Sequence, residues 1–201
     1  MIQHLRPALV LLALFSLLCG VAYPLAITGI AQAALPARAN GSLITKDGKV
    51  IGSSLIGQSF TEARYFHGRP SAAGAGGYDA SASSGSNLGA SSKTLQERIA
   101  ADKARLSAEN PATPVPADLL YASASGLDPD ISPEAALFQV PRVSLAHGLT
   151  KEYLRTLIAQ HTQPRLFGFL GEPSVNVLEL NLALDASPQP APTEPAAKIS
   201  R

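Results

Sequence analysis

The chain has 201 residues and a formal net charge of +1, because 16 basic side chains stand against 15 acidic ones. This balance leaves no basic surface able to neutralise many phosphates, which argues against nucleic-acid binding. A single cysteine excludes an intrachain disulfide. Charged residues make up only 15% of the chain, below the roughly 25% of an ordinary soluble domain, and the deficit is greatest near the N-terminus.

The N-terminal segment is apolar enough to cross a membrane. Residues 7–37 carry no charged side chain, and a membrane-spanning helix needs only about 20 apolar residues. We therefore predict a transmembrane helix over residues 7–30, after a cytoplasmic N-terminus of residues 1–6. Pro24 is expected to kink this helix or mark its end. Small residues that permit close helix approach predict a packing surface for partner helices: Gly20, Ala22, Ala26 and Gly29.

A cleaved signal peptide is the alternative interpretation of this segment. Residues 31–33 (Ala-Gln-Ala) have the small-x-small form of a cleavage site. Signal h-regions span only about 7–15 residues, which favours a retained helix. Lipid attachment at Cys19 is disfavoured because the preceding Leu18 is large. A count of basic residues on the two flanks would place the C-terminal side in the cytoplasm. Long domains are translocated largely regardless of charge, so we expect the N-terminus inside and the domain outside, in the periplasm.

Turn chemistry and alternation predict the non-helical parts of the domain. An Asp-Gly pair between two β-type segments predicts a hairpin over residues 42–52. Residues 71–92 are dominated by Gly, Ala and Ser, which is typical of a flexible linker or loop. Leucines alternate with other residues from Leu178 to Leu184, and this period of two predicts a half-buried strand. The Pro-rich residues 187–201 are predicted to form a disordered tail.

Three helices are predicted from capping residues and hydrophobic spacing. Thr94 and Glu97 have the spacing of a capping box, whereas Pro141 should bend or split the second helix. With the predicted strands, these helices indicate an α/β (α+β) domain over residues 31–186. The helices are residues 93–110, a segment that begins at Ser132, and a segment from Thr150 to about His161.

Few residue patterns point to chemistry. The sequence holds no GxSxG elbow, Walker loop, HExxH or Rossmann fingerprint, and it lacks the Asp-Lys-Thr-Gly-Thr signature of an aspartyl-phosphate pump. We predict no enzymatic activity, no catalytic residue, no metal site and no bound cofactor for the chain alone. Four residues form a candidate polar surface, although ordinary turns and loops are the favoured explanation of each: His67, Arg69, Asn87 and Asp128.

The local reasons for these four differ. A glycine separates His67 from Arg69, so an imidazole and a guanidinium lie close in sequence. Asn87 lies in a Gly-Ser-Asn-Leu-Gly segment whose backbone can cradle an anion. Asp128 and Asp130 precede a helix start and can bind a cation or cap the turn. In the alternative of a secreted enzyme or binding protein, His67, Arg69 and Glu172 would line a pocket.

Several segments, in this order, resemble a known family. The similarity covers roughly residues 7–185, and the segments together resemble KdpC, the C subunit of the bacterial high-affinity potassium-transporting (Kdp) ATPase. The Ala/Gly/Ser loop at residues 72–77, Asp130 in place of a common His, and the Pro-rich tail depart from the family pattern. The segments are residues 39–44 (ANGSLI), 52–58 (GSSLIGQ), 65–71 (YFHGRPS), 85–89 (GSNLG), 125–133 (SGLDPDISP) and 170–178 (LGEPSVNVL).

The resemblance implies a single-span inner-membrane subunit with a periplasmic domain. Its partners would be a channel-like potassium-translocating subunit, a P-type subunit that hydrolyses ATP, and a small membrane peptide. In this family the C subunit is described as an assembly factor and as a catalytic chaperone that raises the ATP affinity of the pump subunit. ATP is thus implied for the complex, and no nucleotide-binding residue is carried over to this sequence.

Overall fold

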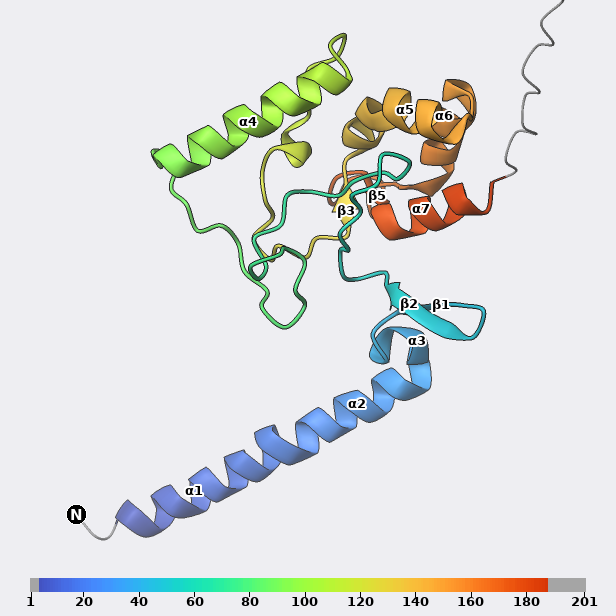
Figure 1. Cartoon of the computed structure of the whole chain (residues 1–201). Helices are drawn as coiled ribbons and strands as arrows, with labels where there is room; N and C mark the ends of the chain where they lie inside the picture. The colour runs from blue at the N-terminus through green and yellow to red at the C-terminus, as the bar shows by residue number, and fades with distance from the viewer. Residues whose placement is uncertain (1–3, 188–201) are drawn as a thin grey trace, which may run out of the picture. The chain divides into compact units, whose positions relative to one another are not determined.

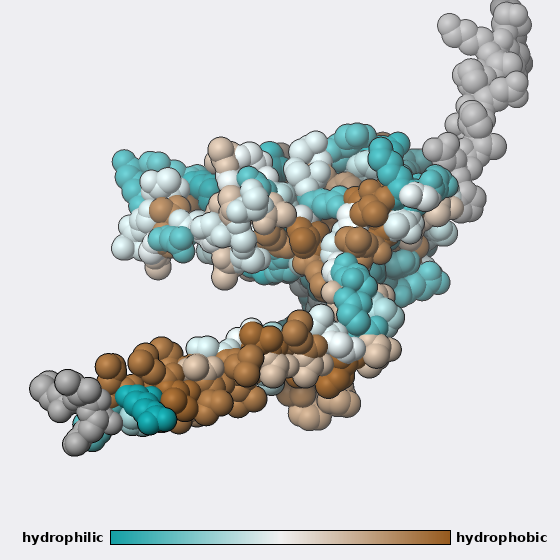
Figure 2. Space-filling view, turned by 90° about the horizontal axis from the view of Figure 1, so that it is seen from below, coloured by the Kyte–Doolittle hydropathy of each residue, from teal (hydrophilic) through white to brown (hydrophobic). Residues whose placement is uncertain are grey.

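The computed structural model describes residues 4–187, which divide into two compact units between Ser53 and Ser54 (Figure 1). The first unit begins with a helix from Leu5 to Ala34 that is 30 residues long, with a mean hydropathy of 2.3 in its most apolar window. Within its own unit, as far as the structure describes it, no side chain of this helix is buried. In Figure 2 apolar residues cover most of its visible face. Its length and composition agree with the predicted transmembrane helix and extend it at both ends.

Pro24 does not end this helix. The segment consists of α1 (Leu5–Leu17), a π-helical turn (Leu18–Ala22) and α2 (Tyr23–Ala34). Pro24 has no N–H for the carbonyl of Gly20, and in a regular α-helix its ring would press on that carbonyl. The wider π turn directly before Pro24 makes room for the ring, so the helix continues.

A short helix and a hairpin complete the first unit. After α3 (Pro36–Ala39), strands β1 (Leu43–Lys46) and β2 (Lys49–Ser53) pair antiparallel. Asp47 and Gly48 form the turn with φ of 52° and 74°. The predicted Asp-Gly hairpin is therefore confirmed, and the positive φ at both positions explains the choice of residues.

The second unit packs helices against a small antiparallel sheet. The sheet has the order β3-β5-β4, and Val175 of the central strand pairs with Ile131 on one side and Thr162 on the other. The core contains the fully buried Phe66, Leu154 and Leu180, so it joins an irregular segment to two helices. The elements are α4 (Lys93–Glu109), a 3-10 turn (Ala117–Leu119), β3 (Asp130–Ile131), α5 (Pro133–His147), α6 (Lys151–His161), β4 (Thr162–Gln163), β5 (Ser174–Asn176) and α7 (Val177–Asp185).

Capping side chains fix where the predicted helices begin. Ser132 caps α5 as expected, and Thr150, where the third helix is predicted to begin, caps α6; each accepts a hydrogen bond from a backbone N–H three residues on. The cap of α4 is Ser92, which accepts from the N–H of Leu95, so the predicted capping box at Thr94 is wrong. Pro141 lies inside α5 without splitting it. The predicted loop of residues 71–92 contains no helix or strand.

The predicted strand at Leu178–Leu184 is wrong, because these residues form most of helix α7. Asn176 caps this helix by accepting a hydrogen bond from the N–H of Glu179 at 3.1 Å. Leucine favours helices more than strands, since it is not β-branched. Val177, Leu180 and Leu184 are buried on one helical face together with Asn181, so the alternating leucines also satisfy a helical period. The predicted tail, residues 187–201, lies outside the described residues apart from Ser187.

Candidate functional site

The candidate site is organised by an irregular segment, residues 57–71, that two buried amide side chains hold in place. Asn181 from α7 accepts from the N–H of Phe66 at 2.8 Å and donates to its carbonyl at 2.9 Å. Gln139 from α5 does the same for His67, at 2.8 and 3.1 Å. Each amide therefore replaces a neighbouring strand for one residue of backbone. Both amides are at least 97% buried, and burial without these partners would be costly.

The His67 ring lies beside this amide clamp, defined as Asn181 and Gln139 with the backbone they hold. Its Nε2 lies 3.0 Å from the carbonyl of Glu62. A carbonyl can only accept, so Nε2 carries a proton and donates it. Burial, and then the neighbouring Arg142 guanidinium, lower the pKa of His67 below its ordinary value. The ring is therefore held neutral. A neutral ring is better suited to holding the segment in position than to binding a ligand through a positive charge.

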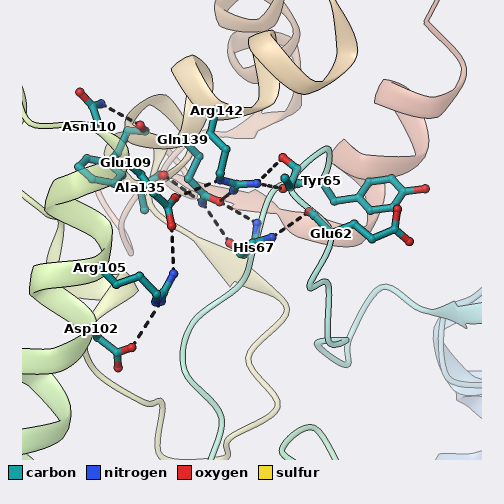
Figure 3. Close-up of polar contacts among 12 residues, drawn as sticks. Glu62, Tyr65, His67, Asp102, Arg105, Glu109, Asn110, Ala135, Gln139 and Arg142 are labelled. Carbon is teal, nitrogen blue, oxygen red and sulfur yellow. Dashed lines mark hydrogen bonds and ion pairs between the residues drawn. The ribbon is translucent and has the colours of Figure 1, made fainter.

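Arg142 connects the segment to α4, as Figure 3 shows. Its guanidinium donates to the carbonyls of Ala63 and Tyr65, at 2.5 and 2.9 Å, and to Gln139 Oε1 at 2.7 Å. Arg142 Nε lies 3.2 Å from a carboxylate oxygen of Glu109, which also pairs with an arginine of α4. A guanidinium matches this task because its five N–H donors have fixed directions.

Arg69 and Asp128, two members of the predicted polar surface, meet in an ion pair with 3.0 Å between Arg69 Nη1 and Asp128 Oδ2. Both side chains are roughly a quarter exposed. Tyr78 completes the arrangement, because its hydroxyl donates to the carbonyl of Arg69 at 2.5 Å. Burial, assisted by the Asp128 carboxylate, raises the pKa of Tyr78 to about 12, so the phenol stays a neutral donor.

Two glycines leave the space that Tyr78 fills. A Cβ on Gly68 would lie 2.6 Å from the Tyr78 hydroxyl oxygen. A Cβ on Gly57 would lie 2.5 Å from the Asp128 carbonyl oxygen and 2.9 Å from the Tyr78 ring. Neither distance is compatible with a side chain. These glycines are therefore required for close approach.

Two cavities flank the Arg69–Asp128 pair. His67 and Arg69 share the first, which has a volume of about 220 Å³ and also receives Arg105, Asp102 and Tyr78. The second has a volume of about 360 Å³ and is acidic, with Arg69 as its one basic lining residue. The carboxylates that line the second cavity are those of Asp118, Asp128, Asp130, Glu134 and Glu172.

The four predicted polar residues therefore fall into two groups. The structure brings His67, Arg69 and Asp128 to neighbouring cavities. Asn87 is exposed, has a φ of 51°, and lines neither cavity. Sequence reasoning missed Gln139, Asn181, Arg142 and Tyr78. For Gln139 and Asn181, the feature of the sequence that could indicate a buried role is a polar amide on an otherwise apolar helical face.

The polar groups of the site mostly bond to the chain itself. The Ser71 hydroxyl donates to the carbonyl of Gly126 at 2.6 Å and accepts from the N–H groups of Ala73 and Tyr78. Among residues 4–187, no three His, Cys, Asp or Glu side chains converge closely enough to hold a metal ion. The arrangement is suited to fixing long loops against the helical core, and thus to presenting a surface of defined shape.

The fold and site together define a class: an α+β domain, rigidified by internal polar contacts, on a chain with one helix able to span a membrane. A family model described as "K+-transporting ATPase, c chain" (KdpC) matches residues 5–186. The chain is 57% identical to a Rhodopseudomonas palustris protein over 198 residues, covering 93% of this chain and all of that protein. It is 60% identical to a Caulobacter vibrioides protein over 187 residues, covering 92% and 94%. Both relatives are named "Potassium-transporting ATPase KdpC subunit".

The chain therefore belongs to the KdpC family, and it is a subunit of a potassium-transporting ATPase. The resemblance inferred from its sequence segments is confirmed. The match begins at the start of the apolar helix and ends one residue after α7, so it extends over both compact units.

Replacing Gly68 by alanine should destabilise the domain by about 1–3 kcal/mol, the usual cost of overpacking. The Tyr78 hydroxyl cannot move away easily, because it is bonded to the Arg69 carbonyl. Urea unfolding of the detergent-purified chain, followed by circular dichroism, measures the change. Gly76→Ala is the matched control, since its Cβ would meet nothing within 4 Å. The pair Gly68→Ala/Tyr78→Phe should lose less than the sum of its single variants; full additivity would contradict the assigned contact.

The lowered pKa of His67 predicts that acid destabilises the domain. The unfolded chain takes up a proton near pH 6.5, whereas folded His67 resists it. The free energy of unfolding should fall as the pH drops below about 6.5 and level off below the folded pKa. Burial also lowers the pKa of His147, so the comparison is made between His147→Gln and His147→Gln/His67→Gln. The double variant should lose less stability between pH 7.5 and 5.5; equal losses would show that His67 does not contribute.

Proposed function

We propose that the chain is a non-catalytic accessory subunit of an ATP-driven, high-affinity potassium uptake complex in the bacterial inner membrane. Residues 1–6 would lie in the cytoplasm and residues 31–186 in the periplasm. Its partners would be the channel-like potassium-translocating subunit, the P-type ATP-hydrolysing subunit and a small membrane peptide. The observation that carries this proposal is the helix from Leu5 to Ala34, which is apolar and long enough to span a membrane and whose side chains are not buried within its own unit.

The geometry of that helix supports a packing role for its small residues. At about 100° per residue, Ala22, Ala26 and Gly29 lie within about a sixth of the helix circumference. Gly20 lies on roughly the opposite side. Gly20 is therefore left out of the packing surface that we propose, which consists of Ala22, Ala26 and Gly29. A built Cβ on Gly29 meets nothing within 4 Å, so the described residues do not require it to be small, whereas close approach of another helix would.

The same helix offers a route by which the subunit affects ATP binding. We propose that it raises the ATP affinity of the pump subunit through contacts between membrane-spanning helices. A periplasmic domain is separated from cytoplasmic ATP by a hydrocarbon layer about 30 Å thick. Coupling then requires only that the pump subunit's ATP-binding state prefers the assembled helix contacts.

Gly29→Leu should reduce co-purification of the potassium-translocating and ATP-hydrolysing subunits several-fold. The added side chain blocks close helix approach on the face shared with Ala22 and Ala26. Gly20→Leu makes the same change on the opposite face and should leave co-purification near the unaltered level. The measurement is an affinity pull-down of the tagged chain from detergent extract, quantified by mass spectrometry.

Unchanged recovery of both subunits with Gly29→Leu would contradict the packing role. Failure of the unaltered chain to recover either subunit would contradict the proposed function as a whole. The intact mass of the recovered chain also distinguishes a retained helix from cleavage after residues 31–33.

The indirect route predicts that the purified chain alone gives no saturable ATP binding at micromolar concentrations. Isothermal titration of the full chain in detergent measures this directly. In the assembled complex, Gly29→Leu should raise the KM for ATP of any complex that still forms. Tight ATP binding by the isolated chain would contradict the proposal that ATP affinity is raised indirectly through helix contacts. It would not contradict the proposed role in subunit assembly.

A further inference from the structure

The connection between β4 and β5 ends in an exposed apolar tip, defined as Leu166–Leu170. Leu166, Phe167, Phe169 and Leu170 are 62%, 79%, 71% and 48% exposed. No charge lies between Arg165 and Glu172. These two side chains pair at the base of the tip, with 2.5 Å between Arg165 Nη2 and Glu172 Oε2. Four large apolar residues on one turn are a contiguous exposed patch, which usually marks a site of interaction.

The tip has a defined backbone structure. Leu166 and Leu170 exchange N–H···O bonds of 2.8 and 3.0 Å, and the N–H groups of Gly168 and Phe169 also bond within the turn. Phe167 adopts a φ of 55° and Gly168 one of 83°, and a positive φ is uncommon for a bulky residue. The chain thus holds two phenylalanines outward on a turn that satisfies much of its own backbone.

These features suit entry into a bilayer interface. Backbone groups that leave water need internal hydrogen bonds, and four of the five N–H groups of the tip have them, those of Leu166, Gly168, Phe169 and Leu170. The side chains of the tip contain no polar atom with which to recognise a particular protein surface, whereas protein interfaces usually combine apolar anchors with polar contacts. The ion-paired base has no net charge, so it matches a zwitterionic headgroup layer without needing anionic lipid.

We propose that Leu166–Leu170 inserts into the headgroup and upper acyl region of the membrane in which the chain is anchored. This inference rests on the proposed anchoring by the helix from Leu5 to Ala34. Residues 35–53 link that helix to the second unit, and even a fully extended chain of this length spans only roughly 65 Å. The tip would give the domain a second membrane contact.

The absence of tryptophan from the sequence provides a direct test. Phe167→Trp introduces a single tryptophan at the tip, and Phe169→Trp repeats the test if the first variant does not fold. Leu145→Trp is the matched control, because Leu145 is 88% exposed on α5. Each full chain is placed in nanodiscs of phosphatidylcholine, with or without brominated acyl chains, and circular dichroism checks its folding.

The tip variants should show blue-shifted emission and at least twofold stronger quenching by brominated lipid than Leu145→Trp. Equal, weak quenching at both positions would overturn the proposal. Shielding of the tip tryptophan only after the other subunits are added would also overturn it, and would assign the tip to a protein pocket. A chain that does not enter nanodiscs at all would instead contradict the proposed anchoring.

Discussion

The second unit depends on two amide side chains that act in place of a β-strand. Asn181 and Gln139 each bind both backbone groups of one residue, Phe66 and His67. The Phe66 ring is thereby fixed in the core with no exposed surface. An unsatisfied buried donor or acceptor costs about 1–3 kcal/mol. Loss of either amide would therefore leave the backbone groups of Phe66 or His67 unpaired and would no longer fix the position of that residue's aromatic side chain.

The fixed segment also holds the long loops in place, namely residues 71–92 and the stretch before β3. Arg69 and Ser71 extend from it to Asp128 and Gly126, and so connect it to the stretch before β3. A Cβ on Gly126 would lie 2.5 Å from the carbonyl oxygen of Ser84. The small residues of the 71–92 loop and its neighbours therefore permit close backbone packing, and their abundance does not by itself indicate a flexible linker.

Local chemistry explains which parts of the fold could be predicted. The hairpin, the caps at Ser132 and Thr150, and the apolar helix each follow from a few adjacent residues. Helix α7 could not be assigned from alternation, because Leu180 and Leu184 satisfy both a strand and a helical period. The residue that starts the helix is its cap, Asn176, whose side chain also donates to the carbonyl of Ser54 and to Asp130.

The site was only partly predictable for a related reason. His67, Arg69 and Asp128 were identified as polar residues in turns, but their pairing depends on tertiary contacts. Arg69 and Asp128 are 59 positions apart, and Phe66 and Asn181 are 115 apart. The neighbours of Gln139 and Asn181 in the sequence do not fix their burial, because a single polar residue in a largely apolar stretch is also compatible with a surface position; the folded chain buries both.

The position of α7 has a consequence for how the protein is made. The apolar helix leaves the ribosome before the second unit does, whereas Asn181 is among the last of the described residues to be synthesised. The backbone groups of Phe66 therefore cannot bond to Asn181 until a further 115 residues, more than half of the chain, have been synthesised. Contacts of such long sequence separation form slowly, and apolar surface that is exposed meanwhile is prone to aggregation. With the proposed anchoring, insertion of the helix would precede folding, and each new domain would fold while already confined to the membrane that contains its proposed partners.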